Sequence, residues 1–405
     1  MTTAPAHLAR REGSWSLRDW AVLLTLSANM ILDAIEVSIV LVALPTIRAD
    51  LGLSLWTVQW LMSGFALGFA ALLIAGPRLT ARWGRRRVYL AAMLGFAAAS
   101  VAGSLADAPA LLIATRVVKG LCAALTAPTG LAIIATLFPE ERRARRAVSV
   151  YSLFGAAGFT AGLLLSGLLL QVSWRGTFLF PAPLALALLL VALRLIPRDR
   201  GTGPPARPVA PLLRNGPLLR TALCAATLNG TYHSLLFLIT FRTQEELGWA
   251  PWRSALALLP ACLPLAVTVP FAAPMVARWG TRRLIALGAA APLAGQALSL
   301  WRPRAGYATG TLPALALVGA GFVLSFAALN MRAADAVPPV DRPAAVPLYQ
   351  TAVQLGAVPM LPLTAWLLTT GDGYRPALAL ITAVGAVGLL TATAGTRTTD
   401  REDQP

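Results

Sequence analysis

The sequence predicts an all-α membrane protein with twelve transmembrane helices arranged as two pseudo-symmetric six-helix bundles. Three observations support this fold class: long apolar runs, arginines that alternate between the connections, and a repeated loop sequence. Of the 405 residues, 57% are hydrophobic and 13% are charged, whereas a typical soluble domain carries about 25% charged residues. Because one bilayer crossing takes about 20 apolar residues of helix, these runs are long enough to span a membrane.

The apolar runs define the order of the helices and the domain boundaries. We place them at 20–45, 56–76, 87–106, 110–137, 147–171, 177–196, 218–241, 252–276, 284–301, 306–329, 345–369 and 375–394. They form an N-terminal bundle at 20–196 and a C-terminal bundle at 218–394, with cytoplasmic tails at 1–19 and 395–405. The connection 197–217 contains six prolines, which predicts an extended cytoplasmic linker.

The distribution of basic residues predicts the orientation. With the N-terminus in the cytoplasm, 24 of the 34 lysines and arginines fall in cytoplasmic segments and 7 fall in outer loops. Cytoplasmic connections of membrane proteins are enriched in these residues, so we expect a multi-pass protein of the inner or plasma membrane with both termini inside. The net charge of +17 then reflects topology and not a nucleic-acid groove.

A short basic sequence occurs twice, once in each half. Residues 81–87 read Ala-Arg-Trp-Gly-Arg-Arg-Arg, and residues 277–283 read Ala-Arg-Trp-Gly-Thr-Arg-Arg. Six of the seven positions match at an offset of 196, and both copies follow the second apolar run of their half. Parallel six-helix repeats related by an axis along the membrane normal are a transporter architecture.

Four stretches resemble the motifs of a known family. They are the loop 77–86, Glu36 with residues 42–45 on the first helix, residues 116–120 on the fourth helix, and residues 173–175 before the sixth. Together they resemble the major facilitator superfamily, and within it the drug:proton antiporters, over nearly the whole chain. Five positions differ from the family motifs: Ala81, Lys119 and Leu163 stand where the family has aspartate, glutamine and proline, and Pro77 and Ser166 stand where it has glycine.

The resemblance implies a function as well as a fold. It implies export of a small amphipathic or antibiotic-like molecule by alternating access in exchange for protons, with the proton gradient in place of a cofactor. The expected partners are the small-molecule substrate and the lipid bilayer, and the expected state is a monomer that binds no nucleic acid. Two other interpretations stay open: a metabolite importer or symporter, and a transporter-like protein that acts as a sensor or a membrane-bound biosynthetic accessory.

Four ionisable residues lie within the apolar runs of the first half. Asp33 and Glu36 are three residues apart on the first helix, and Arg116 and Lys119 are three apart on the fourth. Each pair shares one helix face, and a charge in the middle of a bilayer is costly unless it finds a partner. We expect these four residues to form a charge cluster that couples protons or holds a charged part of the substrate. The structural alternative is a pairing that fastens the two helices together.

The second half has polar but uncharged candidates within its helices. Asn229, Tyr232 and His233 lie on one face of the seventh helix, and Gln350 and Gln354 lie on the eleventh. We expect these residues either to contact substrate or to form interhelical hydrogen bonds. A histidine can also relay protons, although a hydrogen-bonded packing role for His233 is the preferred interpretation.

Two further sets of residues are expected to serve the transport cycle. By resemblance, the repeated loops act as gates, through Arg82, Gly84, Arg85, Arg86, Arg278, Gly280 and Arg282. Glycines on the fifth helix permit close helix packing, namely Gly155, Gly158 and Gly162. The sequence contains no phosphate-binding loop and no cysteine or histidine set with metal-site spacing, so we expect no enzyme activity and no metal.

Overall fold

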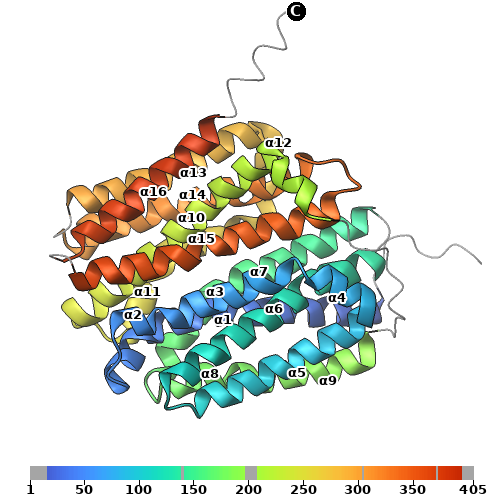
Figure 1. Cartoon of the computed structure of the whole chain (residues 1–405), viewed down its shortest axis with the longest axis horizontal. Coiled ribbons are helices and arrows are strands. Elements are labelled where there is room, and N and C mark those ends of the chain that lie inside the picture. Colours follow the sequence, from blue (N-terminus) through green and yellow to red (C-terminus); the bar gives the residue numbers. More distant parts are fainter. Residues whose placement is uncertain (1–15, 138–140, 197–207, 303–304, 371–372, 395–405) are drawn as a thin grey trace, which may run out of the picture.

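A computed structural model describes residues 16–137, 141–196, 208–302, 305–370 and 373–394. In the first half the long helices are α1 (Leu17–Asp50), α3 (Trp60–Leu73), α5 (Arg85–Ser104), α6 (Pro109–Leu137), α7 (Glu141–Leu169) and α9 (Pro181–Leu195), with short helices α2 (Leu55–Val58), α4 (Gly76–Trp83) and α8 (Arg175–Leu179). In the second half they are α10 (Gly216–Phe241), α11 (Pro251–Thr268), α13 (Thr281–Trp301), α14 (Leu312–Asp335), α15 (Arg342–Thr370) and α16 (Arg375–Ala394), with α12 (Ala272–Trp279) and the short turns η1 (Ala210–Arg214), η2 (Arg242–Glu246), η3 (Val269–Phe271) and η4 (Tyr307–Thr311). Figure 1 shows the two halves as adjacent helical bundles.

Eleven spans in the described residues are long and apolar enough to cross a membrane. The predicted twelfth, at 252–276, is interrupted in the structure: α11 ends at Thr268 and is followed by η3 and α12. Proline explains the interruption, because Pro270 lies in η3 directly after α11 and proline removes a helical hydrogen bond. These three elements occupy the place of the second helix of their half, so the two-times-six arrangement is kept.

The repeat seen in the sequence extends through the backbone. α4 ends and α5 begins at Gly84, while α12 ends and α13 begins at Gly280. Both glycines have positive φ, 85° and 73°, a conformation that L-residues with a Cβ avoid. Gly52 and Gly248, also 196 residues apart, have φ of 61° and 63°. The two halves therefore share their turns as well as their helices. The turn at Gly52 and Gly248 lies outside the repeated loop sequence.

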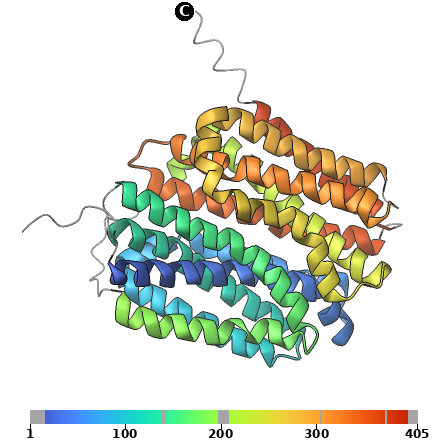
Figure 2. The ribbon, with the colours of Figure 1, turned by 180° about the vertical axis from the view of Figure 1, so that it is seen from behind.

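The two bundles meet along two pairs of helices. α3 packs against α15, and α7 packs against α11; Figure 1 shows the first pair and Figure 2 the second. The glycine-rich face of α7 packs on α1 inside the first bundle, and α10 packs on α15 in the equivalent place of the second. The bundle contacts thus follow the same pseudo-symmetry as the sequence.

The packing differs between the two ends of the molecule. We call the end with Gly84 and Gly280 the basic end, because the repeated arginines lie there, and the end with Gly52 and Gly248 the opposite end. Toward the opposite end a shared core joins both bundles, with Leu41, Leu44, Leu236, Phe237 and Leu361 among its members. Toward the basic end each bundle has a separate core, one around Tyr89 and one around Tyr349.

Side-chain contacts also close the opposite end. Arg48 at the end of α1 pairs with Glu245 in η2 at 2.6 Å, and Gln244 donates to the Val42 carbonyl at 2.9 Å. Both contacts link the first bundle to the second. The described residues therefore form a molecule whose bundles are joined at the opposite end and separately packed at the basic end.

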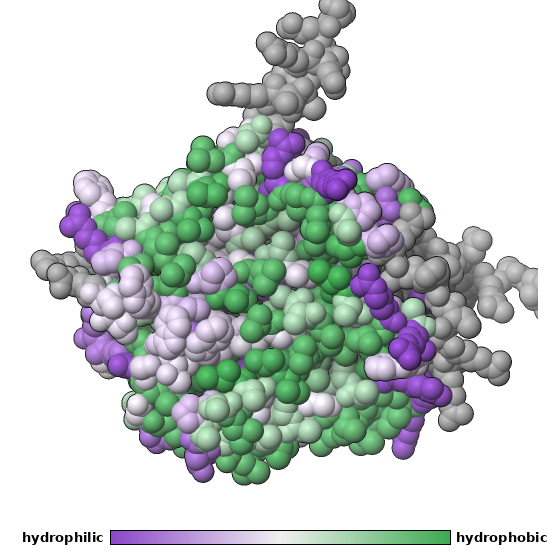
Figure 3. Space-filling view, in the orientation of Figure 1, coloured by the Kyte–Doolittle hydropathy of each residue, from purple (hydrophilic) through white to green (hydrophobic). Residues whose placement is uncertain are grey.

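The surface is consistent with a lipid environment. Figure 3 shows an apolar belt between two more hydrophilic ends, and many leucines on the belt are exposed. Trp56, Trp252 and Trp301 are exposed near helix ends, where indole rings favour the membrane interface.

One prediction needs correction: part of the linker at 197–217 is not extended, because η1 forms a 3-10 turn and α10 begins at Gly216. Residues 197–207 of the linker lie outside the described residues.

Candidate functional site

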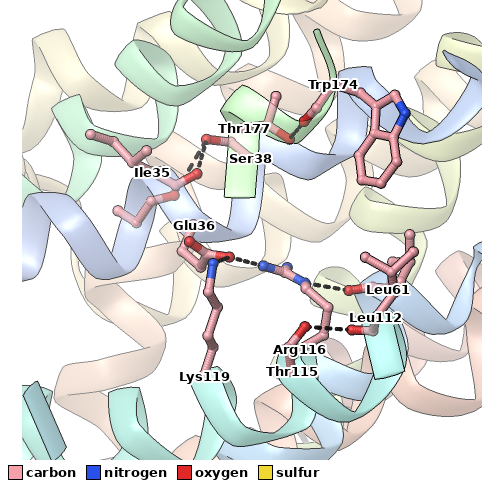
Figure 4. Close-up of polar contacts among 11 residues, drawn as sticks. Ile35, Glu36, Ser38, Leu61, Leu112, Thr115, Arg116, Lys119, Trp174 and Thr177 are labelled. Carbon is pink, nitrogen blue, oxygen red and sulfur yellow. Dashed lines mark hydrogen bonds and ion pairs between the residues drawn. The ribbon is translucent and has the colours of Figure 1, made fainter. Parts of the chain in front are cut away.

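A buried triad of charges lies inside the first bundle. Glu36 on α1 accepts from Arg116 and, at 2.9 Å, from Lys119, both on α6. Arg116 also donates through Nε to the Leu61 carbonyl on α3 at 2.6 Å. Figure 4 shows the two basic side chains converging on the carboxylate. The i, i+3 spacing places both cations on one face of α6, so helices α1, α3 and α6 are held together at one point.

Aromatic rings complete the surroundings of the triad. Arg116 lies over the Phe65 ring at 4.9 Å, and Lys119 lies 5.3 Å from the ring of Phe178. All three charged side chains are fully buried, with an exposure of 0%. A cation over an aromatic face is stabilised by the ring quadrupole, which partly replaces lost hydration. The triad is therefore sealed within the bundle and does not line an open cavity.

Asp33 has different partners from Glu36. Its carboxylate accepts from the Asn29 amide at 3.1 Å and from the Thr126 hydroxyl at 3.0 Å. Among the described residues no cation pairs with it. The four ionisable residues thus lie in one region as expected, but the structure joins three of them and places Asp33 beside neutral groups, one helical turn nearer the basic end.

The second bundle contains a small, partly open hollow of about 30 Å³ between α10, α14 and α15. Its walls combine carboxamides, hydroxyls and apolar groups, and none of its lining residues is charged. The lining comprises Ala225, Leu228, Asn229, Phe322, Ser325, Phe326, Leu329, Asn330, Tyr349, Gln350 and Val353. Asn229 and Gln350 were expected from the sequence, and the structure brings them to the same hollow.

Several lining residues were missed by the sequence analysis. Asn330 accepts from Gln350 at 3.2 Å and donates to the Phe326 carbonyl at 2.9 Å. Phe322, Phe326 and Asn330 follow each other at intervals of four, so they share one face of α14. This spacing was a usable signal, but the predicted apolar run ended at residue 329 and left Asn330 outside it.

The other candidates of the second half lie near the hollow. Tyr232 contacts Phe322 with ring centroids 4.2 Å apart, and Phe159 of the first bundle lies 6.0 Å from Tyr232 and 6.4 Å from His233. His233 bonds through Nδ1 to the Asn229 carbonyl at 2.9 Å. These aromatic rings link the two bundles beside the hollow. Gln354 is half-buried on α15 and does not line the hollow.

The repeat relates the two sites. At the offset of 196, Asp33 corresponds to Asn229 and Glu36 corresponds to Tyr232. Equivalent positions on α1 and α10 therefore carry carboxylates in one half and an amide and a phenol in the other. The first half holds the ionisable groups, and the second half offers neutral hydrogen-bonding groups around a hollow.

The structure places the loop candidates at the basic end and the glycine candidates against α1. Arg82, Arg278 and Arg282 are exposed at the basic end, and Arg86 donates to the Leu193 carbonyl at 2.6 Å. Arg85 is half-buried at the start of α5. Gly155, Gly158 and Gly162 all face α1, with room for no ordinary side chain at the last two. No group of three residues suited to a metal ion occurs in the part of the chain that the structure describes.

A family comparison identifies the fold. The sequence pattern of the Major Facilitator Superfamily matches residues 26–358. The chain belongs to the Major Facilitator Superfamily. Members of this superfamily are membrane transporters, and the eleven apolar spans make this member a multi-pass membrane protein. Two solved superfamily structures have the same fold. A mutant form of the nucleoside transporter NupG is 13% identical, with a TM-score of 0.72, and the match covers 93% of this chain and 100% of that one. A D-xylose-proton symporter is 16% identical, with a TM-score of 0.74, and the match covers 93% of this chain and 97% of that one.

Curated superfamily members with related sequences include drug exporters. The puromycin resistance protein pur8 of Streptomyces alboniger is 37% identical over 204 residues, which are 50% of this chain and 40% of that protein. A probable actinorhodin transporter of Streptomyces coelicolor is 33% identical over 254 residues, which are 61% and 41%. The multidrug efflux pump LfrA of Mycolicibacterium smegmatis is 33% identical over 198 residues, which are 48% and 39%. The matches thus cover less than half of each of these relatives.

Proposed function

We propose that this superfamily member exports a small amphipathic or antibiotic-like molecule by alternating access, in exchange for protons. The observation that carries the proposal is the division of chemistry between the halves. A neutral hollow lined by carboxamides and aromatic rings lies in the second bundle, and buried ionisable groups lie at equivalent positions of the first. Related proteins include a puromycin resistance protein and a multidrug efflux pump, which supports export of such molecules.

The proposed orientation places the basic end in the cytoplasm, with both termini on that side. The repeated arginines support it, because cytoplasmic loops are enriched in arginine. In this orientation the hollow lies nearer the cytoplasmic side, since most of its residues come from the halves of α10, α14 and α15 nearer the basic end. The structure then represents the state that loads substrate from inside the cell, with the outer side closed. The proton gradient supplies the energy, no cofactor is needed, and a monomer suffices because the hollow lies within one chain.

The hollow also indicates which part of a substrate it binds. Asn229 and Asn330 use their amide N–H groups on backbone carbonyls, and the Gln350 amide donates to Asn330. The Asn229 and Gln350 side-chain oxygens therefore stay available as acceptors, beside the Phe322 and Phe326 rings. We propose that hydroxyl or amine donors of the substrate meet these oxygens, while an aromatic or apolar part of it contacts the two rings at the mouth of the hollow.

The proposal is tested in a bacterial host that lacks its own efflux pumps. Cells that express the chain are expected to tolerate puromycin or to expel ethidium, and a protonophore is expected to abolish both effects. Asn330→Ala and Phe322→Ala are expected to reduce efflux several-fold, whereas Leu390→Ala, an exposed position on α16, serves as the matched control. Uptake in place of efflux would reverse the proposed direction, and an absence of flux with a broad compound panel would contradict transport altogether.

A further inference from the structure

We infer that Asp33, and not Glu36, is the group that binds and releases the transported proton, and that Glu36 is a fixed counter-ion. This inference rests on the proposed proton exchange and assigns it to one carboxyl. The sequence resemblance points to Glu36, which precedes residues 42–45 as the family's acid does. The contacts of the two carboxyls point the other way.

Glu36 is held by groups that can only donate. Guanidinium and ammonium groups have no hydrogen-bond acceptor, and Arg116 and Lys119 both donate to the same oxygen of Glu36. A proton placed on Glu36 would find no acceptor there and would leave two buried cations without an anion. An uncompensated buried charge is strongly unfavourable, so these contacts favour the carboxylate form of Glu36.

Asp33 is held by groups that can both donate and accept. The Thr126 hydroxyl and the Asn29 carboxamide each carry donor and acceptor capacity. In the structure both donate to Asp33, and the buried Asn29 Oδ1 atom has no hydrogen-bond partner. Rotation of the Asn29 amide exchanges its NH₂ group for this oxygen, which then accepts from a protonated Asp33. The site therefore satisfies both the carboxylate and the carboxylic acid.

The surroundings of Asp33 contain no competing proton acceptor near neutral pH. The titratable groups that face it are Glu36 on its own helix, Tyr89 on α5, Cys122 on α6 and Tyr151 on α7. Phenols and thiols ordinarily titrate above neutrality, and Glu36 is occupied by its cations. The Tyr89 hydroxyl is buried without a partner, which provides a second neutral group that can turn toward Asp33.

Access and connection to the hollow also favour Asp33. Its residue surface is 5% exposed and lies nearer the basic end, whereas Glu36 is 0% exposed. The inferred route of the proton runs between the Asp33 carboxyl and water at the basic end, which lies one helical turn closer to Asp33 than to Glu36. Helix α1 packs at Ile31 and Ile35 on the glycines of α7, and Phe159 of α7 contacts Tyr232 beside the hollow. If protonation of Asp33 moves α1, these direct contacts carry the movement through α7 to Tyr232 beside the hollow.

The decisive measurement is infrared difference spectroscopy of the purified full-length protein as the pH is changed, which requires no substrate. Wild type is expected to show the C=O stretching band of one protonated buried carboxyl that disappears as the pH rises. Asp33→Asn is expected to lack this band while remaining folded, since an amide already occupies the equivalent position at Asn229. Glu36→Asp keeps the negative charge of the triad and is expected to leave the band unchanged, as is the exposed control Asp107→Asn.

A transport measurement separates this inference from the proposed function. In everted vesicles with ethidium as the probe, Asp33→Asn is expected to lose accumulation driven by the proton gradient and to retain ethidium exchange. A band that shifts in Glu36→Asp, or proton-driven accumulation that persists in Asp33→Asn, would overturn the assignment to Asp33 and leave the export function standing. If the infrared band is lost only in Asp33→Asn but the wild-type protein transports no ethidium, Asp33 is upheld as the proton site and export is refuted.

Discussion

At the scale of single residues, the triad is a strong structural constraint whatever its role in transport. Breaking a buried ion pair by removing one partner costs about 3–5 kcal/mol, and Glu36 is the only anion that contacts Arg116 and Lys119 among the described residues. Glu36→Gln is therefore expected to lower the thermal unfolding temperature of the detergent-solubilised protein markedly. The measurement is tryptophan fluorescence during heating.

The matched control for this prediction is an exposed ion pair. Arg48 and Glu245 are each about one third exposed, at 34% and 36%, and exposed pairs contribute about 0–1 kcal/mol. Glu245→Gln is expected to leave the unfolding temperature nearly unchanged. Equal effects of the two substitutions would show that the buried triad does not stabilise the bundle.

The sequence was sufficient to find the charged residues but not to divide their roles. The i, i+3 spacing and the apolar surroundings of Asp33, Glu36, Arg116 and Lys119 placed them near each other, as the structure shows. Which acid meets which cation depends on helix rotation and on the depth of α1 relative to α6. Because adjacent turns differ by only about 5.4 Å along a helix, the spacing alone left both acids equally placed.

At the scale of the elements, the contact of α1 with α7 depends on three glycines that behave differently. A Cβ added at Gly158 would lie 2.7 Å from the Ile31 carbonyl, which is backbone and cannot turn away. A Cβ added at Gly155 would lie 3.0 Å from the end of the flexible Met30 side chain. Methionine adapts easily to changes in packing, so the two positions form a matched pair.

We expect Gly158→Ala to destabilise the protein and Gly155→Ala to be tolerated. Overpacking costs about 1–3 kcal/mol, while replacing glycine by alanine within a helix gains about 1 kcal/mol. The net result is a loss of stability at Gly158 and little change at Gly155, measured as unfolding temperature and as expression in the membrane. Similar losses at both positions would contradict the distinction between backbone and side-chain neighbours.

Most of the elements were predicted by hydropathy and prolines, but several runs are divided in the structure, and the expected loop at 77–86 contains helix α4. The run at 252–276 became α11, η3 and α12, and the end of the linker became η1. Hydropathy reports how much apolar surface a segment offers, but breaks within it depend on local hydrogen bonds near proline. The hollow was predicted only in part, because it needs α10, α14 and α15 to be brought together, and no spacing within one helix contains that information.

At the scale of the whole molecule, the bundles are joined at the opposite end and have separate cores at the basic end. We predict an equilibrium with a second state in which the opposite end is open. Arg48 and Glu245 form an ion pair between the two bundles at the opposite end, so opening of that end is expected to separate them. Glu245→Arg replaces this attraction by a repulsion. A bias of about 1 kcal/mol changes a two-state ratio roughly fivefold, so the population in which the opposite end is open is expected to increase several-fold.

Cysteine labelling at the two ends measures this shift. In a background without the buried Cys122, Cys224 and Cys262, Val42→Cys reports on the closed end, because its residue is 0% exposed and its carbonyl accepts from Gln244 of the other bundle. Val353→Cys reports on the hollow.

Adding Glu245→Arg is expected to speed maleimide labelling at position 42 and to slow it at position 353. The charge swap that combines Glu245→Arg with Arg48→Glu restores an attractive pair and is expected to return both rates toward their starting values. Rates that rise together at both positions would indicate general loosening of the fold, and rates that stay unchanged would mean that the shared core alone closes the opposite end.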